Sequence, residues 1–117
     1  MLATSLVLVV ALLHGTFMVL EMLLWATPIG QRVFERTRAE QEATAPLAKN
    51  QGLYNGFLAA GLVWAAFAHE SALALRMFFL GCVVVAGVYG AATASKKILY
   101  VQALPGLIAL AVTWLAR

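Results

Sequence analysis

The chain alternates between long apolar segments and shorter polar breaks. The apolar segments cover residues 2–26, 50–68, 73–93 and 98–116. Each is close to the roughly 20 residues that an α-helix needs to cross the hydrocarbon core of a bilayer. Residues 6–13 are apolar on every face, whereas the strands of membrane β-barrels alternate apolar and polar residues. The pattern therefore predicts an all-α integral membrane protein, a four-helix bundle that forms one domain over residues 1–117.

The break after the first apolar segment is the longest of the three. It opens with Thr27-Pro28-Ile29-Gly30. Proline lacks a backbone donor and glycine tolerates terminal conformations, so we expect the first helix to end there. The stretch from residue 32 to residue 49 then carries charges of both signs. It is either an interfacial helix or a solvated loop, and both interpretations stay open.

Composition supports the membrane prediction and excludes several classes of protein. Hydrophobic residues make up 63% of the chain and charged residues 11%, too few charges to cover the surface of a soluble domain of this size. The formal net charge of +3 comes from basic residues beside the apolar segments, so we expect no nucleic-acid partner. Cys82 is the only cysteine, which excludes an intrachain disulfide, and we expect no metal site.

The distribution of Lys and Arg predicts the orientation in the membrane, because loops rich in these residues stay in the cytoplasm. The first and third breaks, which lie on one side of the membrane, hold six basic residues: Arg32, Arg36, Arg38, Lys49, Lys96 and Lys97. The second break and the chain ends, on the other side, hold two: Arg76 and Arg117. We therefore expect a multi-pass protein of the bacterial inner (plasma) membrane, with the N-terminus and the C-terminus outside the cytoplasm.

Glu21 is the one charged residue inside an apolar segment. The other charged residues lie in the breaks or at the end of the chain. An ionisable group in a membrane helix costs free energy and usually has a function. With the first helix running to residue 26, Glu21 is expected about two turns from its inner end. It has either a ligand-binding, proton-carrying or catalytic role, or a structural role as a hydrogen-bonding group.

Further polar residues are expected at the same depth as Glu21, at the inner ends of all four helices. They are Asn50, Gln51, Asn55, Tyr89, Thr93, Lys96, Tyr100 and Gln102, and His14 is a further candidate because it shares a helix face with Glu21. Pairs seven or four residues apart share a helix face, such as His14 with Glu21 and Gln51 with Asn55. The outer halves of the segments carry almost no polar residues, so this asymmetry predicts a polar pocket near the cytoplasmic side.

Most of these residues also have a simpler interpretation. His14 is either a ligand or an ordinary core histidine, and Asn50 and Gln51 are either pocket residues or caps of the second helix. Lys96 is first of all a charge that flanks a membrane segment on its inner side. The aromatic belt of the membrane interface is the favoured interpretation of Trp25, Tyr54 and Tyr100.

Small residues recur at helical spacing in the second and third segments. These are Gly52, Gly56 and Ala60, and then Gly87, Gly90, Ala91 and Ala94. Such stripes let helix backbones approach closely in membranes. They predict contacts within the chain or between subunits, and we expect a homo-oligomer, either a dimer or a trimer, in the lipid bilayer.

Several motifs resemble those of a known family. The segment Asn50-Gln-Gly-Leu-Tyr-Asn-Gly-Phe-Leu-Ala-Ala-Gly61 is the longest of them. The others are His14…Glu21…Trp25, Ala86-Gly-Val-Tyr-Gly-Ala-Ala-Thr93 and Gln102-Ala-Leu-Pro-Gly106. Over nearly its whole length the chain resembles the small bacterial membrane proteins known as domain-of-unknown-function 1304. This resemblance implies a fold and no activity.

A more distant resemblance concerns the superfamily of membrane-associated proteins in eicosanoid and glutathione metabolism. Lys49-Asn50 is similar to the basic-Asn pair that opens the second helix there, and Tyr100-Val-Gln-Ala-Leu-Pro105 to the opening of the fourth. This implies trimers that bind glutathione between subunits near the cytoplasmic face. The helix-3 arginine that activates the thiol has no counterpart between residues 77 and 95, so a thiolate has little to stabilise it here.

Two functions follow as alternatives. In the first, a cytoplasmic-side pocket centred on Glu21 binds a small polar or amphipathic ligand, as in an enzyme of that superfamily that has lost the thiol-activating arginine. In the second, the chain is a subunit of a proton-coupled transporter or exporter. A third interpretation makes the polar groups purely structural. The sequence identifies no cofactor and leaves open whether the protein is an enzyme.

Overall fold

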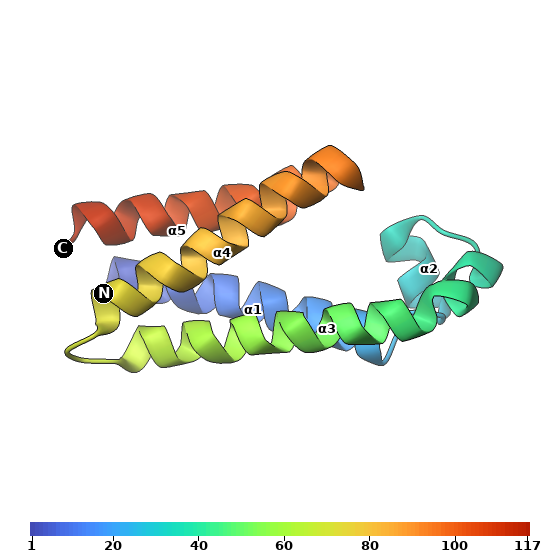
Figure 1. Ribbon diagram of the computed structural model, residues 1–117, viewed down its shortest axis with the longest axis horizontal. Helices are drawn as coiled ribbons and strands as arrows, with labels where there is room; N and C mark the ends of the chain where they lie inside the picture. The colour runs from blue at the N-terminus through green and yellow to red at the C-terminus, as the bar shows by residue number, and fades with distance from the viewer. The chain divides into compact units, whose positions relative to one another are not determined.

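The structure is a computed structural model that describes all residues from 1 to 117. It contains α-helices and one π-helical turn and no strand, which confirms the all-α prediction. In chain order the elements are α1 (Leu2–Met22), α2 (Pro28–Phe34), α3 (Arg38–Phe67), α4 (Ala72–Thr93), η1 (Leu99–Ala103) and α5 (Leu104–Leu115) (Figure 1).

The chain divides into two compact parts, which we describe separately. The core part consists of residues 1–13 and 58–117, and the crossing part of residues 14–57. Both α1 and α3 contribute residues to each part, because the division falls inside these two helices.

Four helices supply the apolar centre of the core part. The buried residues that form it are Val7, Val10 and Ala11 of α1, Leu62 and Ala66 of α3, Leu80 and Val83 of α4, and Ala109 of α5. They are aliphatic side chains and alanines, which allow the helices to pack closely. Helices α4 and α5 lie side by side, connected through η1 (Figure 1).

Arg76 holds helix ends together at one edge of the core part. Its Nε donates to the carbonyl oxygen of Ala65 at 3.0 Å, and its Nη2 donates to the carbonyl oxygen of Ala66 at 2.9 Å and to Thr4 Oγ1 at 3.0 Å. Those carbonyls belong to the last turn of α3, where they have no partner within the helix and carry the negative end of its dipole. The guanidinium therefore satisfies one helix end and ties it to the start of another.

The last apolar segment is not one continuous α-helix, as the sequence pattern suggested. Pro105 cannot donate to the carbonyl of Val101 and its ring crowds that carbonyl, so the chain widens into a π-turn in which the Leu104 N–H bonds to Leu99 O. Helix α5 begins directly after this turn. The turn packs tightly on α4, since a Cβ at Gly87 would lie 2.8 Å from the backbone nitrogen of Ala103.

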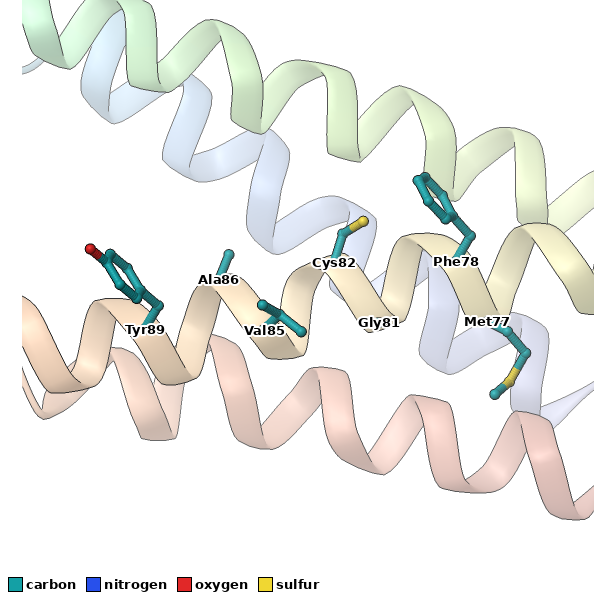
Figure 2. A pocket seen from close by; sticks show the side chains of 7 residues that line it. All are labelled: Met77, Phe78, Gly81, Cys82, Val85, Ala86 and Tyr89. Carbon is teal, nitrogen blue, oxygen red and sulfur yellow. The ribbon is translucent and has the colours of Figure 1, made fainter.

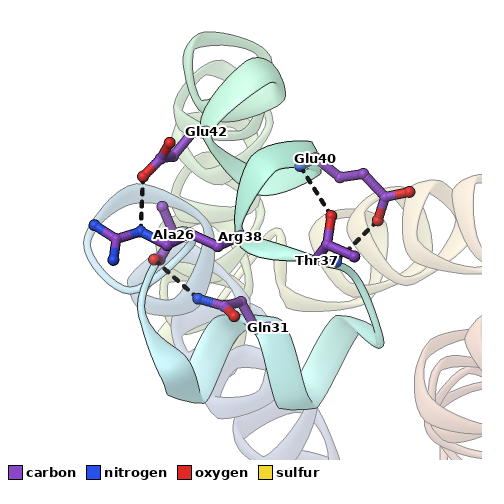
Figure 3. Close-up of polar contacts among 6 residues, drawn as sticks. All are labelled: Ala26, Gln31, Thr37, Arg38, Glu40 and Glu42. Atoms are coloured by element: carbon purple, nitrogen blue, oxygen red, sulfur yellow. Dashed lines mark hydrogen bonds and ion pairs between the residues drawn. The ribbon is translucent and has the colours of Figure 1, made fainter.

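In the crossing part, α1 ends at Met22, earlier than the expected boundary at residue 26. Side-chain donors account for the early end, because they replace the next helical turn for three carbonyls. Thr27 Oγ1 donates to Leu24 O at 2.6 Å, Gln41 Nε2 to Trp25 O at 2.8 Å, and Gln31 Nε2 to Ala26 O at 3.4 Å (the last in Figure 3).

The Thr27-Pro28-Ile29-Gly30 motif begins a helix instead of only ending one. Thr27 is the N-cap of α2, with its side chain accepting from the Gly30 N–H, and Pro28 occupies the first turn, where a missing donor costs little. Gly30 is required here, because a Cβ would collide with the carbonyl oxygens of Leu24 and Trp25.

Helix α3 starts at Arg38, well before the expected start at residue 50. Thr37 and Glu40 form a capping box, in which the Glu40 N–H donates to Thr37 Oγ1 at 3.2 Å and the Thr37 N–H donates to Glu40 Oε2 at 2.9 Å (Figure 3). The solvated-loop interpretation of residues 38–49 is therefore wrong. Asn50 and Gln51 lie inside the helix, so they do not cap it.

Two helices are long and apolar enough to cross a membrane, Leu2–Met22 and Ala72–Thr93, and the apolar helical stretch Leu99–Leu115 is shorter. The final helix boundaries thus differ from the expected ranges 2–26, 50–68, 73–93 and 98–116 mainly around the first break and at η1.

Two glycines of α4 provide a matched test of the packing in the core part. A Cβ at Gly81 meets nothing within 4 Å, whereas one at Gly87 meets the Ala103 backbone. Gly81→Ala should raise stability by about 0.5–1 kcal/mol, because alanine has the better helix propensity. Gly87→Ala should lower it by about 1–3 kcal/mol through overpacking.

Thermal unfolding of the purified variants in detergent measures both effects. Equal shifts of the midpoint in the two variants would contradict the close packing of η1 against α4.

Candidate functional site

The candidate site lies in the crossing part, where α1 and α3 approach closely at two glycines. A Cβ at Gly52 would lie 2.6 Å from Met22 Cγ and 3.1 Å from Glu21 Cβ, and one at Gly56 would lie 2.7 Å from Met18 Sδ. No larger residue fits at either position without movement of a neighbour. The predicted contact of the Gly52 and Gly56 stripe is therefore confirmed, and it is a contact within the chain.

This close approach brings Glu21 of α1 against Asn55 of α3. The Asn55 side-chain nitrogen donates to Glu21 Oε1 at 2.7 Å. Glu21 is 8% exposed and Asn55 7%. Only one of the two carboxyl oxygens is used in this contact, and the partner is a neutral amide and not a cation.

Glu21 lies nearer to the end of its helix than expected. Because α1 ends at Met22, the carboxyl belongs to the last turn of the helix instead of lying about two turns from the end. Its burial comes from the crossing with α3 and the methionines beside the glycines. The predicted distance of about two turns from the helix end is therefore wrong, whereas Glu21 is buried as predicted.

His14 is buried on the same helix, two turns before Glu21. Its side chain is fully buried, and its ring packs edge-on against Phe17 with the centroids 5.4 Å apart. Seven residues of helix separate it from Glu21, an axial distance of about 10 Å, so the two side chains are not in direct contact. The packing against Phe17 agrees with the core-histidine interpretation.

The other predicted residues of the crossing part are not joined to this pair. Asn50 and Gln51 are exposed on α3. Gln51 lies one turn before Asn55, so it is close to the pair along the helix without bonding to it.

The remaining predicted residues belong to the core part. Tyr89 and Tyr100 are 71% and 66% exposed, and Lys96 is also exposed. The Thr93 hydroxyl donates to the backbone oxygen of Tyr89 at 2.7 Å, and Gln102 Nε2 donates to Val83 O at 3.2 Å. Thr93 and Gln102 thus bond to helix backbone in this structure, and a pocket that includes these five residues stays a prediction.

The core part also has a shallow apolar groove along one face of α4. Figure 2 shows its lining, which consists of Met77, Phe78, Gly81, Cys82, Val85, Ala86 and Tyr89. All of these residues come from one helix, and nearly all of the exposed groups are apolar. Such a face suits contact with lipid chains or with another helix more than it suits a polar ligand.

Gln41 is a buried polar residue that the sequence analysis missed. It is 1% exposed, and its Nε2 holds the carbonyl oxygen of Trp25. Trp25 is fixed further by its Nε1, which donates to Thr44 Oγ1 at 3.1 Å, and by its ring, which packs on Phe34 with centroids 4.6 Å apart. The Thr37 capping box was the sequence feature that could have placed Gln41 on a helix facing α1.

The Glu21 and Asn55 pair can support two kinds of chemistry. A carboxylate accepts hydrogen bonds and attracts cationic groups, and a protonated carboxyl donates one. The amide of Asn55 can match either state, because it carries both donors and an acceptor. The pair is therefore able to bind a hydrogen-bond donor or to hold a proton.

Comparison with known proteins places the chain in a family. It is 33% identical over 105 residues to "Uncharacterized protein YpaA" of Lactococcus lactis subsp. lactis (strain IL1403), a match that covers 88% of each chain. No solved structure matches it. The family model "Protein of unknown function (DUF1304)" matches residues 8–114. The chain therefore belongs to the DUF1304 family.

Proposed function

We propose that the protein is a multi-pass membrane protein that crosses the bilayer as a four-helix bundle. The spans are α1, the second half of α3, α4, and η1 together with α5. The two long apolar helices support this assignment, as does a core to which all four of these helices contribute. Residues 99–115 are near the lower limit of length for a span.

We propose further that the Glu21 and Asn55 pair binds a small polar or amphipathic ligand from the cytoplasmic side. The observation that carries this proposal is the burial of a carboxyl against a neutral amide at 2.7 Å with one oxygen left for another donor. A buried carboxylate without a cation is costly, and a ligand that supplies a positive or hydrogen-bonding group offsets that cost.

The chemistry of the pair narrows the ligand class. A carboxyl oxygen favours an amine, guanidine or hydroxyl group on the ligand. The apolar neighbours Met18 and Met22 suit a hydrocarbon portion, since methionine adapts to irregular apolar shapes. In this proposal Gln51, which is exposed one turn from Asn55, contacts the polar end of the ligand.

Proton carriage is the second candidate function, and the nature of Asn55 favours it. An amide can donate to the carboxylate and accept from the protonated acid, so the contact survives a change of protonation. Proton flux into liposomes that is lost in Glu21→Gln would favour a transporter subunit over a ligand-binding protein.

The ligand proposal predicts a molecule that co-purifies with the protein and depends on Glu21. In native mass spectrometry, the wild-type protein should carry an adduct of small mass, and Glu21→Gln should lose it because the neutral amide no longer attracts the donor group. Glu42→Gln is the matched control, since Glu42 is an exposed acid of α3.

The same spectra count the subunits, for which a dimer or trimer is expected. An adduct that Glu21→Gln retains at the wild-type level, or a wild-type protein without any adduct, would overturn the ligand proposal. Glu21→Asp, which keeps the charge on a shorter side chain, separates loss of ligand from loss of fold.

The proposed orientation predicts which loops are accessible from each side of the membrane. In a Cys82→Ala background, a cysteine at Ala39 should react with a membrane-impermeant thiol reagent only in inside-out vesicles. A cysteine at His69, between α3 and α4, should react only in right-side-out vesicles. The reverse pattern would invert the topology, and labelling of both sites from one side would contradict a span in α3.

A further inference from the structure

Helix α2 docks on the end of α1 with one face only. Gly30 is buried against the carbonyls of the segment that follows α1, Phe34 packs on the Trp25 ring, and Gln31 bonds to Ala26 O. Ile29 and Val33, on the other side of α2, are by contrast exposed.

The outward face of α2 combines exposed apolar side chains with a cation. Ile29 is 52% exposed and Val33 48%, and they lie four residues apart on one side of the helix. Arg32 is exposed between them in the same stripe. Large aliphatic residues beside arginine on an exposed helix face are typical of helices that lie in the interface of a membrane.

The charges around α2 leave an excess of arginine. Arg36 follows directly after Glu35, which ends the helix in the left-handed conformation with φ 54°. The next acidic residues are engaged within α3, since Glu40 accepts from the Thr37 N–H and Glu42 pairs with Arg38 at 2.8 Å. Arg32 and Arg36 are both exposed, and with Glu35 between them they leave this stretch with one positive charge in excess.

The chain connectivity places α2 at the edge of the bilayer. Helix α1 ends at Met22 and α2 begins at Pro28, so only a short turn separates the end of an apolar span from the amphipathic helix. Helix α3 has 30 residues and is about 45 Å long. It exceeds the roughly 30 Å hydrocarbon core, so its first turns project from the membrane on the same side as α2.

We infer that α2 is a membrane-surface anchor that lies on an anionic phospholipid bilayer. Ile29 and Val33 insert at the boundary of the acyl chains, and Arg32 and Arg36 contact lipid phosphates. The inference rests on the proposed membrane insertion of α1. It adds a contact with a specific lipid class on the cytoplasmic side.

Site-specific fluorescence in lipid nanodiscs tests this anchor. The full chain in a Cys82→Ala background receives a single environment-sensitive thiol label at one of three exposed positions: Ile29, Leu12 in the middle of α1, and Ala39 at the start of α3. Aqueous iodide and lipids with a spin label near the headgroup or deep in the acyl chain then report the depth of each label.

The Ile29 label should be quenched by the shallow lipid spin label and be severalfold less accessible to iodide than the Ala39 label. The Leu12 label should respond to the deep spin label. An Ile29 label as accessible to iodide as Ala39, with Leu12 still in the bilayer, overturns the anchor alone. Exposure of the Leu12 label to iodide overturns the membrane proposal as well.

Lipid charge tests the role of the arginines. The iodide accessibility of the Ile29 label should fall when phosphatidylcholine is partly replaced by phosphatidylglycerol. The double variant Arg32→Gln, Arg36→Gln should lose that response, whereas Arg117→Gln, at the far end of the chain, should keep it. A response to phosphatidylglycerol that is equal in all three proteins would show that lipid charge does not act through these arginines.

Discussion

The close crossing of α1 and α3 is the contact on which the candidate site depends. Gly52 and Gly56 let the two backbones approach, and the approach brings the Asn55 amide within 2.7 Å of Glu21 Oε1. A Cβ at Gly52 would crowd Glu21 Cβ and the backbone oxygen of Met18, whereas one at Gly56 would meet only the flexible Met18 side chain. A substitution at Gly52 therefore disturbs the buried pair more directly. Packing of small residues and burial of a polar pair are thus two aspects of one contact.

The segment between α1 and α3, which we propose to lie on the cytoplasmic side, is held by residues next to the same crossing. After α1 ends at Met22, side chains hold the backbone, above all Gln41, which donates to the carbonyl oxygen of Trp25. Gln41 reaches that carbonyl because α3 begins at Arg38 and runs without a break past Asn55. Helix α2 then packs through Gly30 on the carbonyls of Leu24 and Trp25. The early start of α3 therefore supplies the side chain that satisfies a carbonyl after the end of α1, next to the place where α2 packs.

Hydrophobic pattern alone was sufficient to predict the all-α class, the buried acid at Glu21 and the glycines that mark a helix contact. It failed wherever local polar chemistry decides a boundary. The apolar pattern of the second segment begins at residue 50, but the Thr37 and Glu40 capping box starts the helix at Arg38. Likewise, side-chain donors end α1 at Met22, and Pro105 produces the π-turn before α5.

The partners of Glu21 were only partly predictable. Asn55 could be proposed because it lies too far inside its helix to be a cap, and the structure joins it to Glu21. Asn50 and Gln51 were predicted to be either pocket residues or helix caps, but both are exposed inside α3. Gln41 was missed, since hydrophobicity carries no information about which polar side chain will satisfy a helix end.

A double-mutant cycle on Glu21 and Asn55 tests the central contact most directly. The free energies of unfolding of wild type, Glu21→Ala, Asn55→Ala and the double variant would be measured in one detergent. If the buried hydrogen bond forms, the two losses are not additive, and the coupling energy is at least about 1 kcal/mol. Losses that add within about 0.5 kcal/mol would contradict the pair and the site built on it.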